Sequence, residues 1–278
     1  MNVLPNVEQV AVFDTAFHQT IPDYNYLYAI PEKYYNKYGI RKYGFHGTSH
    51  KYINEVMQEK LGKKDINIIS CHIGSGASIC VIKDGISYNT TMGFTPLDGL
   101  IMGTRSGTID ASIVDFICNK ENINSEKCIN ILNKESGLLG VSGVSSDLRD
   151  VESASTNNIK ALRAIKMYIK SIVKYIAEYY VELDGDVDAI VFTAGVGENS
   201  SSIRSSVVNA LSKALNINLN VEENDKIAKF KDKQEGIITT SDSKFPVYVI
   251  PTNEEYMILK DTKRLTKENI KKLRKGNI

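Results

Sequence analysis

Several short segments of this sequence combine residue types and spacings that suit the handling of a phosphate group. Three glycine-bearing turns, at residues 71–76, 143–150 and 193–199, follow runs of residues that we expect to be strands. Glycine lets a backbone approach a phosphate closely, and exposed amides at a turn or at the start of a helix attract anions. One Gly-x-Gly is more often a tight turn, but three such turns in one α/β chain favour a nucleotide site.

Charged residues that could act on a phosphate lie elsewhere in the chain. Arg105 stands between two glycines in residues 102–107 (MGTRSG), a setting that suits bidentate clamping of phosphate or carboxylate. Asp14 ends an apolar run that we expect to be a strand, where an acid is as often catalytic or metal-linked as it is a turn residue. Glu254 and Glu255 open an expected helix, and acids there usually pair with the helix dipole rather than with a metal.

All four histidines, His18, His46, His50 and His72, lie in the first quarter of the chain. His46 and His50 are four residues apart and could share a helix face, but a zinc site would need a further ligand. The alternative is an imidazole that faces a phosphoryl group. We assign His18 and His50 to structural roles. The four cysteines form no CxxC pair, which predicts buried thiols in a reducing compartment.

Composition and missing motifs exclude several classes of function. The 278 residues include 34 Lys and Arg against 33 Asp and Glu, so the net charge of +1 gives no reason to expect a nucleic-acid partner. No apolar run approaches the ~20 residues of a membrane helix, and the first ten residues have no export signal. The sequence lacks a P-loop, a third glycine after residues 195–197 and a Gly-x-Ser-x-Gly elbow, which argues against P-loop, dinucleotide-binding and serine-hydrolase enzymes.

The pattern of apolar residues predicts the elements that must position these side chains. Asp84-Gly85 between two apolar runs is a hairpin signal, and helical spacing is clearest over residues 158–181. The expected strands are 66–71, 77–82, 86–91, 188–193 and 247–250, and the expected helices are 49–61, 109–119, 127–132, 158–181 and 203–215. Residues 22–43, rich in tyrosine, are expected to be largely irregular with a short helix. This order indicates an α/β fold with a mixed sheet.

Taken together, the motifs resemble those of the acetate kinase family. They are residues 13–20 (FDTAFHQT), 43–50 (YGFHGTSH), 102–107 (MGTRSG), 193–199 (TAGVGEN) and 251–255 (PTNEE), in the family's order and over nearly the whole chain. The resemblance implies the α/β actin-like ATPase (ribonuclease H-like) fold, with two lobes around a nucleotide cleft. It also implies reversible transfer of the γ-phosphoryl of ATP to acetate with Mg²⁺, or Mn²⁺ in its place, giving acetyl phosphate and ADP.

The resemblance assigns roles to the matching residues. Asp14, His46 and Arg105 would be catalytic, Glu254 would help to hold Mg²⁺, and Phe45 and Pro96 would line the pocket for the acetate methyl group. The residues that would cradle ATP are His72, Ile73, Gly74, Ser75, Gly76, Asp147, Leu148, Arg149, Gly195, Val196, Gly197, Glu198 and Asn199.

The sequence departs from the family pattern at its start. Family members open with a strand and a Ser-rich loop beginning Asn-Ala-Gly-Ser-Ser, and this chain enters the pattern after that loop. Ser75 stands where the family commonly has Asn, and Thr108 and Ala111 replace the usual Asp and Pro. We therefore expect a remnant of the N-terminal lobe at 1–14, a complete nucleotide-binding lobe at 15–252 and, at 253–278, a helix that would pack on the missing lobe. We also expect impaired catalysis.

Three other readings stay open from the sequence. The chain could be a kinase of another short-chain acid such as propionate, a non-catalytic nucleotide-binding remnant, or the product of a decayed gene. The resemblance further implies a cytoplasmic homodimer that supplies acetyl phosphate for acetyl-CoA biosynthesis, with no nucleic-acid or membrane partner.

Overall fold

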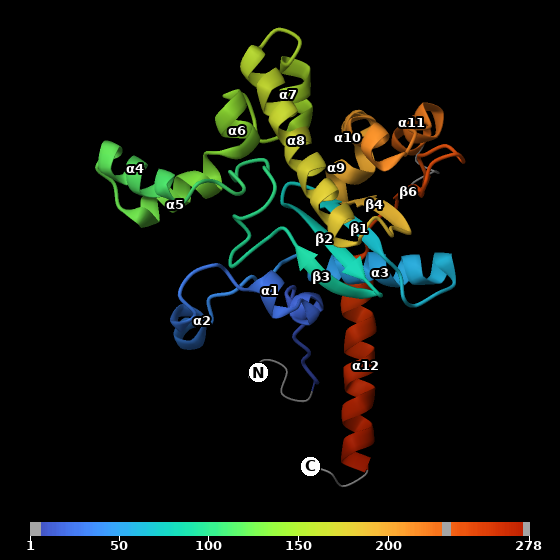
Figure 1. Ribbon diagram of the computed structural model, residues 1–278. Helices are drawn as coiled ribbons and strands as arrows, with labels where there is room; N and C mark the ends of the chain where they lie inside the picture. The colour runs from blue at the N-terminus through green and yellow to red at the C-terminus, as the bar shows by residue number, and fades with distance from the viewer. Residues whose placement is uncertain (1–6, 230–234, 275–278) are drawn as a thin grey trace.

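The structure is built around one mixed β-sheet (Figure 1). The computed structural model describes the backbone of residues 7–229 and 235–274, and the side chains of these residues except 228, 229 and 268–274. Within these ranges the sheet has six strands in the order β3-β2-β1-β4-β6-β5. The strands are β1 (Ile68–Ile73), β2 (Ala77–Lys83), β3 (Ile86–Thr90), β4 (Ala189–Thr193), β5 (Gly236–Ile237) and β6 (Val247–Val249). β4 runs parallel to β1 and β6, and the other pairs are antiparallel, which confirms the expected mixed sheet.

The β2–β3 hairpin forms where the sequence predicted it. Asp84 and Gly85 both have positive φ, 52° and 75°, as the tight turn between strongly twisted antiparallel strands requires. A Cβ on Gly85 would approach the Lys64 carbonyl oxygen to 2.3 Å, so the turn also needs glycine for space. β2 of this hairpin also pairs with β1. The hairpin therefore forms the antiparallel half of the sheet, beside the parallel strands.

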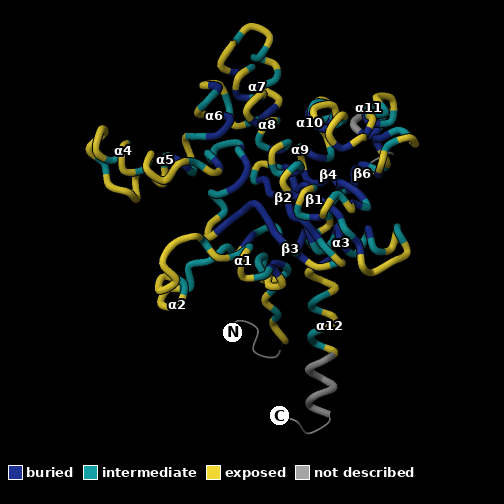
Figure 2. The backbone as a smooth tube through the Cα atoms, in the orientation of Figure 1, coloured by how far each residue is buried: buried dark blue, intermediate teal, exposed yellow. Residues whose placement is uncertain are grey.

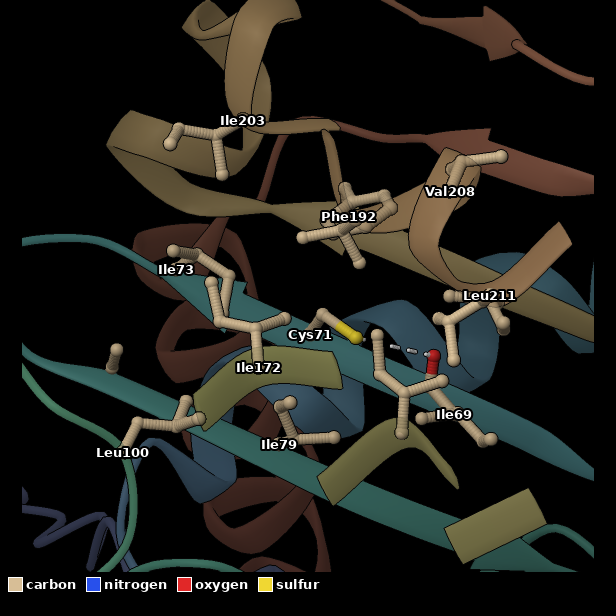
Figure 3. Close-up of a cluster of buried hydrophobic side chains, with 14 of the residues drawn as sticks. Ile69, Cys71, Ile73, Ile79, Leu100, Ile172, Phe192, Ile203, Val208 and Leu211 are labelled. Carbon is tan, nitrogen blue, oxygen red and sulfur yellow. Dashed lines mark hydrogen bonds between the residues drawn. The ribbon is translucent and has the colours of Figure 1, made fainter. Parts of the chain in front are cut away.

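Side chains of β1 alternate between two apolar clusters, one on each face of the sheet. Ile69, Cys71 and Ile73 belong to the larger cluster (Figure 3), which α8 (Ile159–Glu182) covers through Ile172. Ile68 belongs to the smaller cluster on the opposite face, which α3 (Gly47–Leu61) covers. Every residue of β1 is buried, as Figure 2 shows for the centre of the sheet, because helices cover both faces.

Most of the expected helices are confirmed, and several short ones were not predicted. α8 begins after Asn158, whose side chain accepts hydrogen bonds from the backbone N–H groups of Lys160 and Ala161. The other elements are η1 (Ala16–Thr20), α1 (Asp23–Tyr26), α2 (Lys33–Tyr38), α4 (Ser112–Glu121), α5 (Ser125–Lys134), α6 (Gly137–Ser142), α7 (Leu148–Ala154), α9 (Ala194–Asn199), α10 (Ser201–Leu215), α11 (Val221–Lys229) and α12 (Glu254–Arg274). We did not predict α6, α7, α9 or α11.

In Figure 1 the α4–α5 pair and the far end of α12 project away from the sheet. α12 is attached at its start, where Met257 is buried and Asp261 forms an ion pair of 2.6 Å with Lys51 of α3. Ile258 and Leu259 on the same helix remain exposed. Among the described residues, none of the helices combines the length and apolarity that crossing a bilayer requires.

The expected strand ending at Asp14 is not formed. Residues 8–13 have no strand partner among the described residues, and Asp14 lies in a turn that leads into η1. A strand forms only where a neighbouring strand pairs with it, and residues 8–13, which are exposed or half-buried, leave most of their backbone groups to water instead. Asp14 is instead positioned by contacts with the start of α3.

Candidate active site

Two of the three glycine-bearing segments meet at the carboxyl ends of neighbouring parallel strands. His72 of β1 pairs with Thr193 of β4, so the turn at 74–76 and helix α9 lie side by side. Ligands of open α/β sheets bind at such strand ends. The segment 193–199 is not the open turn that we predicted, because residues 194–199 form the short helix α9 directly after β4.

A cavity of about 670 Å³ lies where these segments face α7. Eight of the residues expected to cradle ATP line it: Gly74, Ser75, Asp147, Leu148, Arg149, Gly195, Val196 and Asn199. Gly103 and Thr104 of the MGTRSG segment also line the cavity, together with Glu152, Tyr168 and Ser200–Ser202, which the sequence did not single out. The small polar run after Asn199 was a signal that could have indicated the serines, whereas Glu152 and Tyr168 carry none.

Asp147 and Arg149 form the outer rim of this cavity. The Asp147 side chain caps α7 by accepting from the Arg149 backbone N–H at 2.9 Å, and it also pairs with the Arg149 guanidinium. These bonds lower the pKa of Asp147 to about 2. Because the Arg149 side chain is 87% exposed, it remains accessible to an anion.

The other five residues expected to cradle ATP do not line the cavity. Ile73 belongs to the apolar core (Figure 3), and Gly76, His72 and Gly197 lie next to lining residues. Glu198 turns back into the protein, where its carboxylate accepts from the backbone N–H groups of Ala194 at 2.7 Å and Thr252 at 3.1 Å. Glu198 therefore braces the cavity wall rather than facing the cavity.

A buried arginine that the sequence analysis missed anchors the same wall. Arg204 of α10 is fully buried, and its guanidinium donates to the carbonyl oxygens of Gly197 at 2.9 Å and Glu198 at 2.7 Å. It also donates to the side chain and backbone of Asn224. Burial lowers the pKa of Arg204 to about 10, so the side chain stays charged and holds the last turn of α9.

Asp14 is fixed at the first turn of α3. Its carboxylate accepts from the backbone N–H of His46 at 2.6 Å and of Thr48 at 3.4 Å, and its carbonyl oxygen accepts from Gly47 N–H at 2.8 Å. A Cβ on Gly47 would lie 2.2 Å from that carbonyl oxygen, so only glycine fits there. His46 itself has φ of 55°, a conformation that turns the chain into the helix. An acid at a helix start is also favoured by the helix dipole.

His46 and Arg105 converge beside Gly76. The point where a Cβ on Gly76 would stand lies 3.4 Å from both His46 Nε2 and Arg105 Nη1. Nη1 also donates to the Pro96 carbonyl oxygen at 3.3 Å, which orients the guanidinium. The structure therefore brings Asp14, His46 and Arg105 together, and the space between the last two adjoins the cavity through Gly74–Gly76 and Thr104.

The electrostatics of this group favour a neutral imidazole. Burial lowers the pKa of His46, the nearby Asp14 carboxylate raises it, and Arg105 lowers it. The His46 ring stacks on His72 with centroids 4.1 Å apart, and burial lowers the pKa of His72 to about 3. At neutral pH, Arg105 supplies positive charge at this point and His46 supplies one neutral ring nitrogen.

The two expected pocket residues lie next to these groups. Phe45 directly precedes His46 and packs against the larger core cluster, and its carbonyl oxygen is hydrogen bonded to His18 Nε2 at 3.0 Å. Pro96 contacts Arg105 through its carbonyl oxygen. His18 is buried, as expected of a structural histidine, and it holds the backbone that carries Phe45.

Glu254 lies near the same centre. Its pKa is raised by burial and, secondarily, by the charge of Asp14, so two carboxylates act on each other there. The described residues contain no group of three or more His, Cys, Asp or Glu side chains that could hold a metal ion. A cation that takes one or two carboxylates and completes its shell with phosphate oxygens and water, as Mg²⁺ does, fits this arrangement.

Comparison with known proteins is consistent across sequence and structure. The model of the Acetokinase family matches residues 1–260. Acetate kinase from Thermoanaerobacterium thermosaccharolyticum is 52% identical over 267 residues, which cover 95% of this chain and 65% of the relative. Acetate kinase from Caldanaerobacter subterraneus is 51% identical over 269 residues, which cover 95% of this chain and 65% of that relative. The chain thus spans about 65% of the length of these curated relatives.

Solved structures give the same picture. Porphyromonas gingivalis acetate kinase superposes with a TM-score of 0.89 at 43% identity, covering 95% of this chain and 66% of that one. A propionate kinase from Francisella tularensis gives 0.86 at 42% identity, covering 92% and 64%. The expected actin-like ATPase fold is therefore confirmed.

Proposed function

This chain belongs to the acetokinase family, and we propose that it transfers the γ-phosphoryl group of ATP to acetate, reversibly, giving acetyl phosphate and ADP. The observation that supports this most directly is the convergence of His46 Nε2 and Arg105 Nη1, each 3.4 Å from one point beside Gly76 at the edge of the glycine-lined cavity. A triphosphate in the cavity, with its terminal phosphate directed to that point, would meet both groups.

The chemistry requires positioning and charge stabilisation more than proton transfer. Acetate is already a carboxylate at neutral pH, so one of its oxygens attacks the γ-phosphorus directly while the bond from that phosphorus to the ADP oxygen breaks. Charge spreads over the equatorial phosphoryl oxygens during transfer. Arg105 and the His46 N–H would bind those oxygens, and Asp14 would hold the His46 backbone in place. Preorganised donors of this kind supply much of the stabilisation in such sites.

Glu254 is the residue that we propose for Mg²⁺. It would hold the cation together with the nucleotide phosphates, and Mg²⁺ would neutralise charge on the transferred group. The raised pKa of Glu254, caused by burial and by Asp14, is what a nearby cation would reverse.

Phe45 and Pro96 are proposed to bound the acyl pocket. A propionate kinase is the second candidate, because the Francisella propionate kinase structure superposes nearly as well as the acetate kinase structure. One methylene in an apolar pocket changes specificity by about 10- to 200-fold, so competition between the two acids separates the candidates.

The test is acetyl phosphate formation from ATP and acetate, trapped with hydroxylamine, alongside calorimetric titration of ATP. We expect turnover that depends on acetate and on Mg²⁺ and that Arg105→Ala lowers at least 100-fold. Saturable ATP binding without any turnover would instead support a non-catalytic nucleotide-binding module, and absence of both would refute the proposal.

We also propose a cytoplasmic homodimer. α8 carries exposed Ile159, Met167 and Val181. A shallow groove along the helix is lined by Ile159, Leu162 and Met167 together with Arg163, Lys166 and Lys170. Apolar patches of this kind mark protein interfaces. Light scattering coupled to gel filtration would give twice the mass of one chain if the proposal is right and the mass of one chain if it is wrong.

A further inference from the structure

Behind His46 lies a chain of hydrogen bonds that the phosphoryl-transfer chemistry above does not use. His46 Nδ1 is 2.9 Å from Ser78 Oγ, which is 2.8 Å from His50 Nε2. His50 Nδ1 is in turn 2.9 Å from Ser70 Oγ. The chain therefore runs from Ser70 through His50 and Ser78 to the side of the His46 ring that faces away from the cavity.

The fold places these groups in register. In the antiparallel β1–β2 pair, His72 lies opposite Ser78 and Ser70 lies opposite Cys80, so Ser70 and Ser78 emerge on the same face of the sheet. α3 covers that face and supplies His50. Ser70, Ser78 and His50 all have 0% exposure, and water therefore cannot replace a missing partner at small cost.

The number of protons in the chain decides its direction. A hydroxyl has one proton to donate, and a neutral imidazole has one N–H and one acceptor nitrogen. Among the described residues, Ser70 Oγ has no hydrogen-bond partner except His50 Nδ1. Ser70 therefore satisfies its proton by donating to Nδ1, and His50 must carry its own proton on Nε2.

The remaining steps follow in order. His50 Nε2–H donates to Ser78 Oγ, and the one proton of Ser78 then points to His46 Nδ1. With Nδ1 acting as an acceptor, the proton of neutral His46 stands on Nε2. The reverse direction would leave the buried Ser70 hydroxyl without an acceptor, which lowers the population of that arrangement by about tenfold or more.

We infer that Ser70, His50 and Ser78 are positioning residues that hold neutral His46 in the tautomer with its proton on Nε2, directed at the space beside Gly76 and Arg105. In that tautomer, His46 donates a hydrogen bond to an anionic oxygen without first being protonated. In the other tautomer, a bare ring nitrogen would face the same oxygen and repel it. The consequence for phosphoryl transfer rests on the proposed function, but the tautomer itself does not.

The direct test is the imidazole ¹⁵N spectrum of the whole chain labelled at histidine. The four histidines give four pairs of ring signals, and a His46→Gln variant assigns one pair. His18 serves as an internal reference, because its Nε2 faces the Phe45 carbonyl oxygen and must carry the proton. We expect His46 in the same Nε2–H form at pH 7.5, and a predominant Nδ1–H form would overturn the inference.

Substitutions at Ser78 test the cause. Ser78→Ala removes the hydroxyl that links the two rings, and we expect the His46 signals to move toward a mixture of tautomers. Ser78→Thr keeps a hydroxyl and should restore them. Ser87→Ala is the matched control, because Ser87 is a buried serine bonded to a different histidine, His18, and it should leave the His46 signals unchanged. Unchanged His46 signals in a folded Ser78→Ala would also overturn the inference.

Kinetics add a readout that a purely structural role would not give. We expect Ser78→Ala to lower kcat roughly 3- to 10-fold with little change in the KM for ATP, and Ser78→Thr to recover it. A wild-type chain with the Nε2–H tautomer and no acetyl phosphate formation would refute the proposed function and leave the inference standing. An active chain with the Nδ1–H tautomer would do the opposite.

Discussion

Gly76→Ala is the substitution that tests the geometry of the proposed site most sharply. The added methyl group would lie 3.4 Å from His46 Nε2 and 3.4 Å from Arg105 Nη1. An oxygen bound to these nitrogens needs to stand about 2.7–3.2 Å from each, so the methyl group would occupy the position where a phosphoryl oxygen is expected.

The expected loss follows from the two contacts. A hydrogen bond to a charged group contributes about 1.5–3 kcal/mol, so removing both weakens transition-state binding by about 3–6 kcal/mol. That range corresponds to a decrease in kcat of about 10² to 10⁴-fold. The fold should tolerate the change, because Gly76 does not have positive φ and the distances are ordinary van der Waals contacts. We expect the free energy of unfolding to stay within about 1 kcal/mol of the wild type.

The assay combines trapped acetyl phosphate, calorimetric ATP titration and urea unfolding. Gly195→Ala is the matched control, because it also adds a methyl group at the cavity wall but has no other atom within 4 Å of the new carbon. Because Gly195 lines the proposed ATP cavity, any effect should fall on the KM for ATP, and kcat at saturating ATP should stay within about threefold of the wild type. A folded Gly76→Ala protein that binds ATP and keeps kcat within threefold would refute the assignment of this point to the reacting phosphoryl group.

Three further outcomes are expected. The free energy of unfolding should fall by about 1.4 kcal/mol per histidine for each pH unit below 6.5. The unfolded chain binds protons in this range, whereas in the folded protein burial lowers the pKa of His18 to about 4 and that of His72 to about 3. Urea unfolding at pH 7.5, 6.5 and 5.5 measures this dependence, and a stability that does not change with pH would contradict it. Arg204→Met should lower the free energy of unfolding by about 3 kcal/mol or more and weaken ATP binding, because it leaves the Gly197 and Glu198 carbonyls and Asn224 without their donor; a stable variant with unchanged ATP affinity would show that Arg204 does not support the wall. Glu254→Gln should raise the Mg²⁺ concentration for half-maximal activity about tenfold, and an unchanged Mg²⁺ dependence would remove Glu254 from the metal site.

Sequence patterning predicted the elements that carry strong local signals. The hairpin followed from Asp84-Gly85, and α8 from its apolar period and its Asn158 cap, because turn and helix signals lie within a few residues. Two of the three glycine segments lie at strand ends as expected, whereas residues 143–150 follow helix α6 rather than a strand. The short helices were missed because a single turn has little periodicity to detect. Asp14 was placed on a strand because an apolar run says nothing of whether a pairing partner exists.

The contacts that organise the site depend on long-range register, which local patterns do not contain. We expected His50 to be structural, and its link to His46 passes through Ser78, 28 residues away along the chain. That link exists because β1 and β2 pair so that Ser70 and Ser78 face α3 together. The sequence around Arg204 did not predict its role, because an arginine on a helix is usually exposed. Its four acceptors, the carbonyl oxygens of Gly197, Glu198 and Asn224 and the Asn224 side chain, come from residues that local patterns do not connect to it.

If His46 is neutral, Arg105 supplies the positive charge of the proposed site and His46 supplies a hydrogen-bond donor, an arrangement that suits a reversible transfer. Burial and the neighbouring Arg105 disfavour an imidazolium at His46 although the Asp14 carboxylate favours it, so the fixed charge resides on Arg105 and the histidine contributes a directed hydrogen bond. An imidazolium donor would be lost as the pH rose through its pKa, whereas an Nε2–H held by Ser78 persists. The rate in both directions should therefore show no histidine titration between about pH 7 and 9, and the acid limb should coincide with the loss of stability caused by the buried histidines rather than with a separate catalytic pKa.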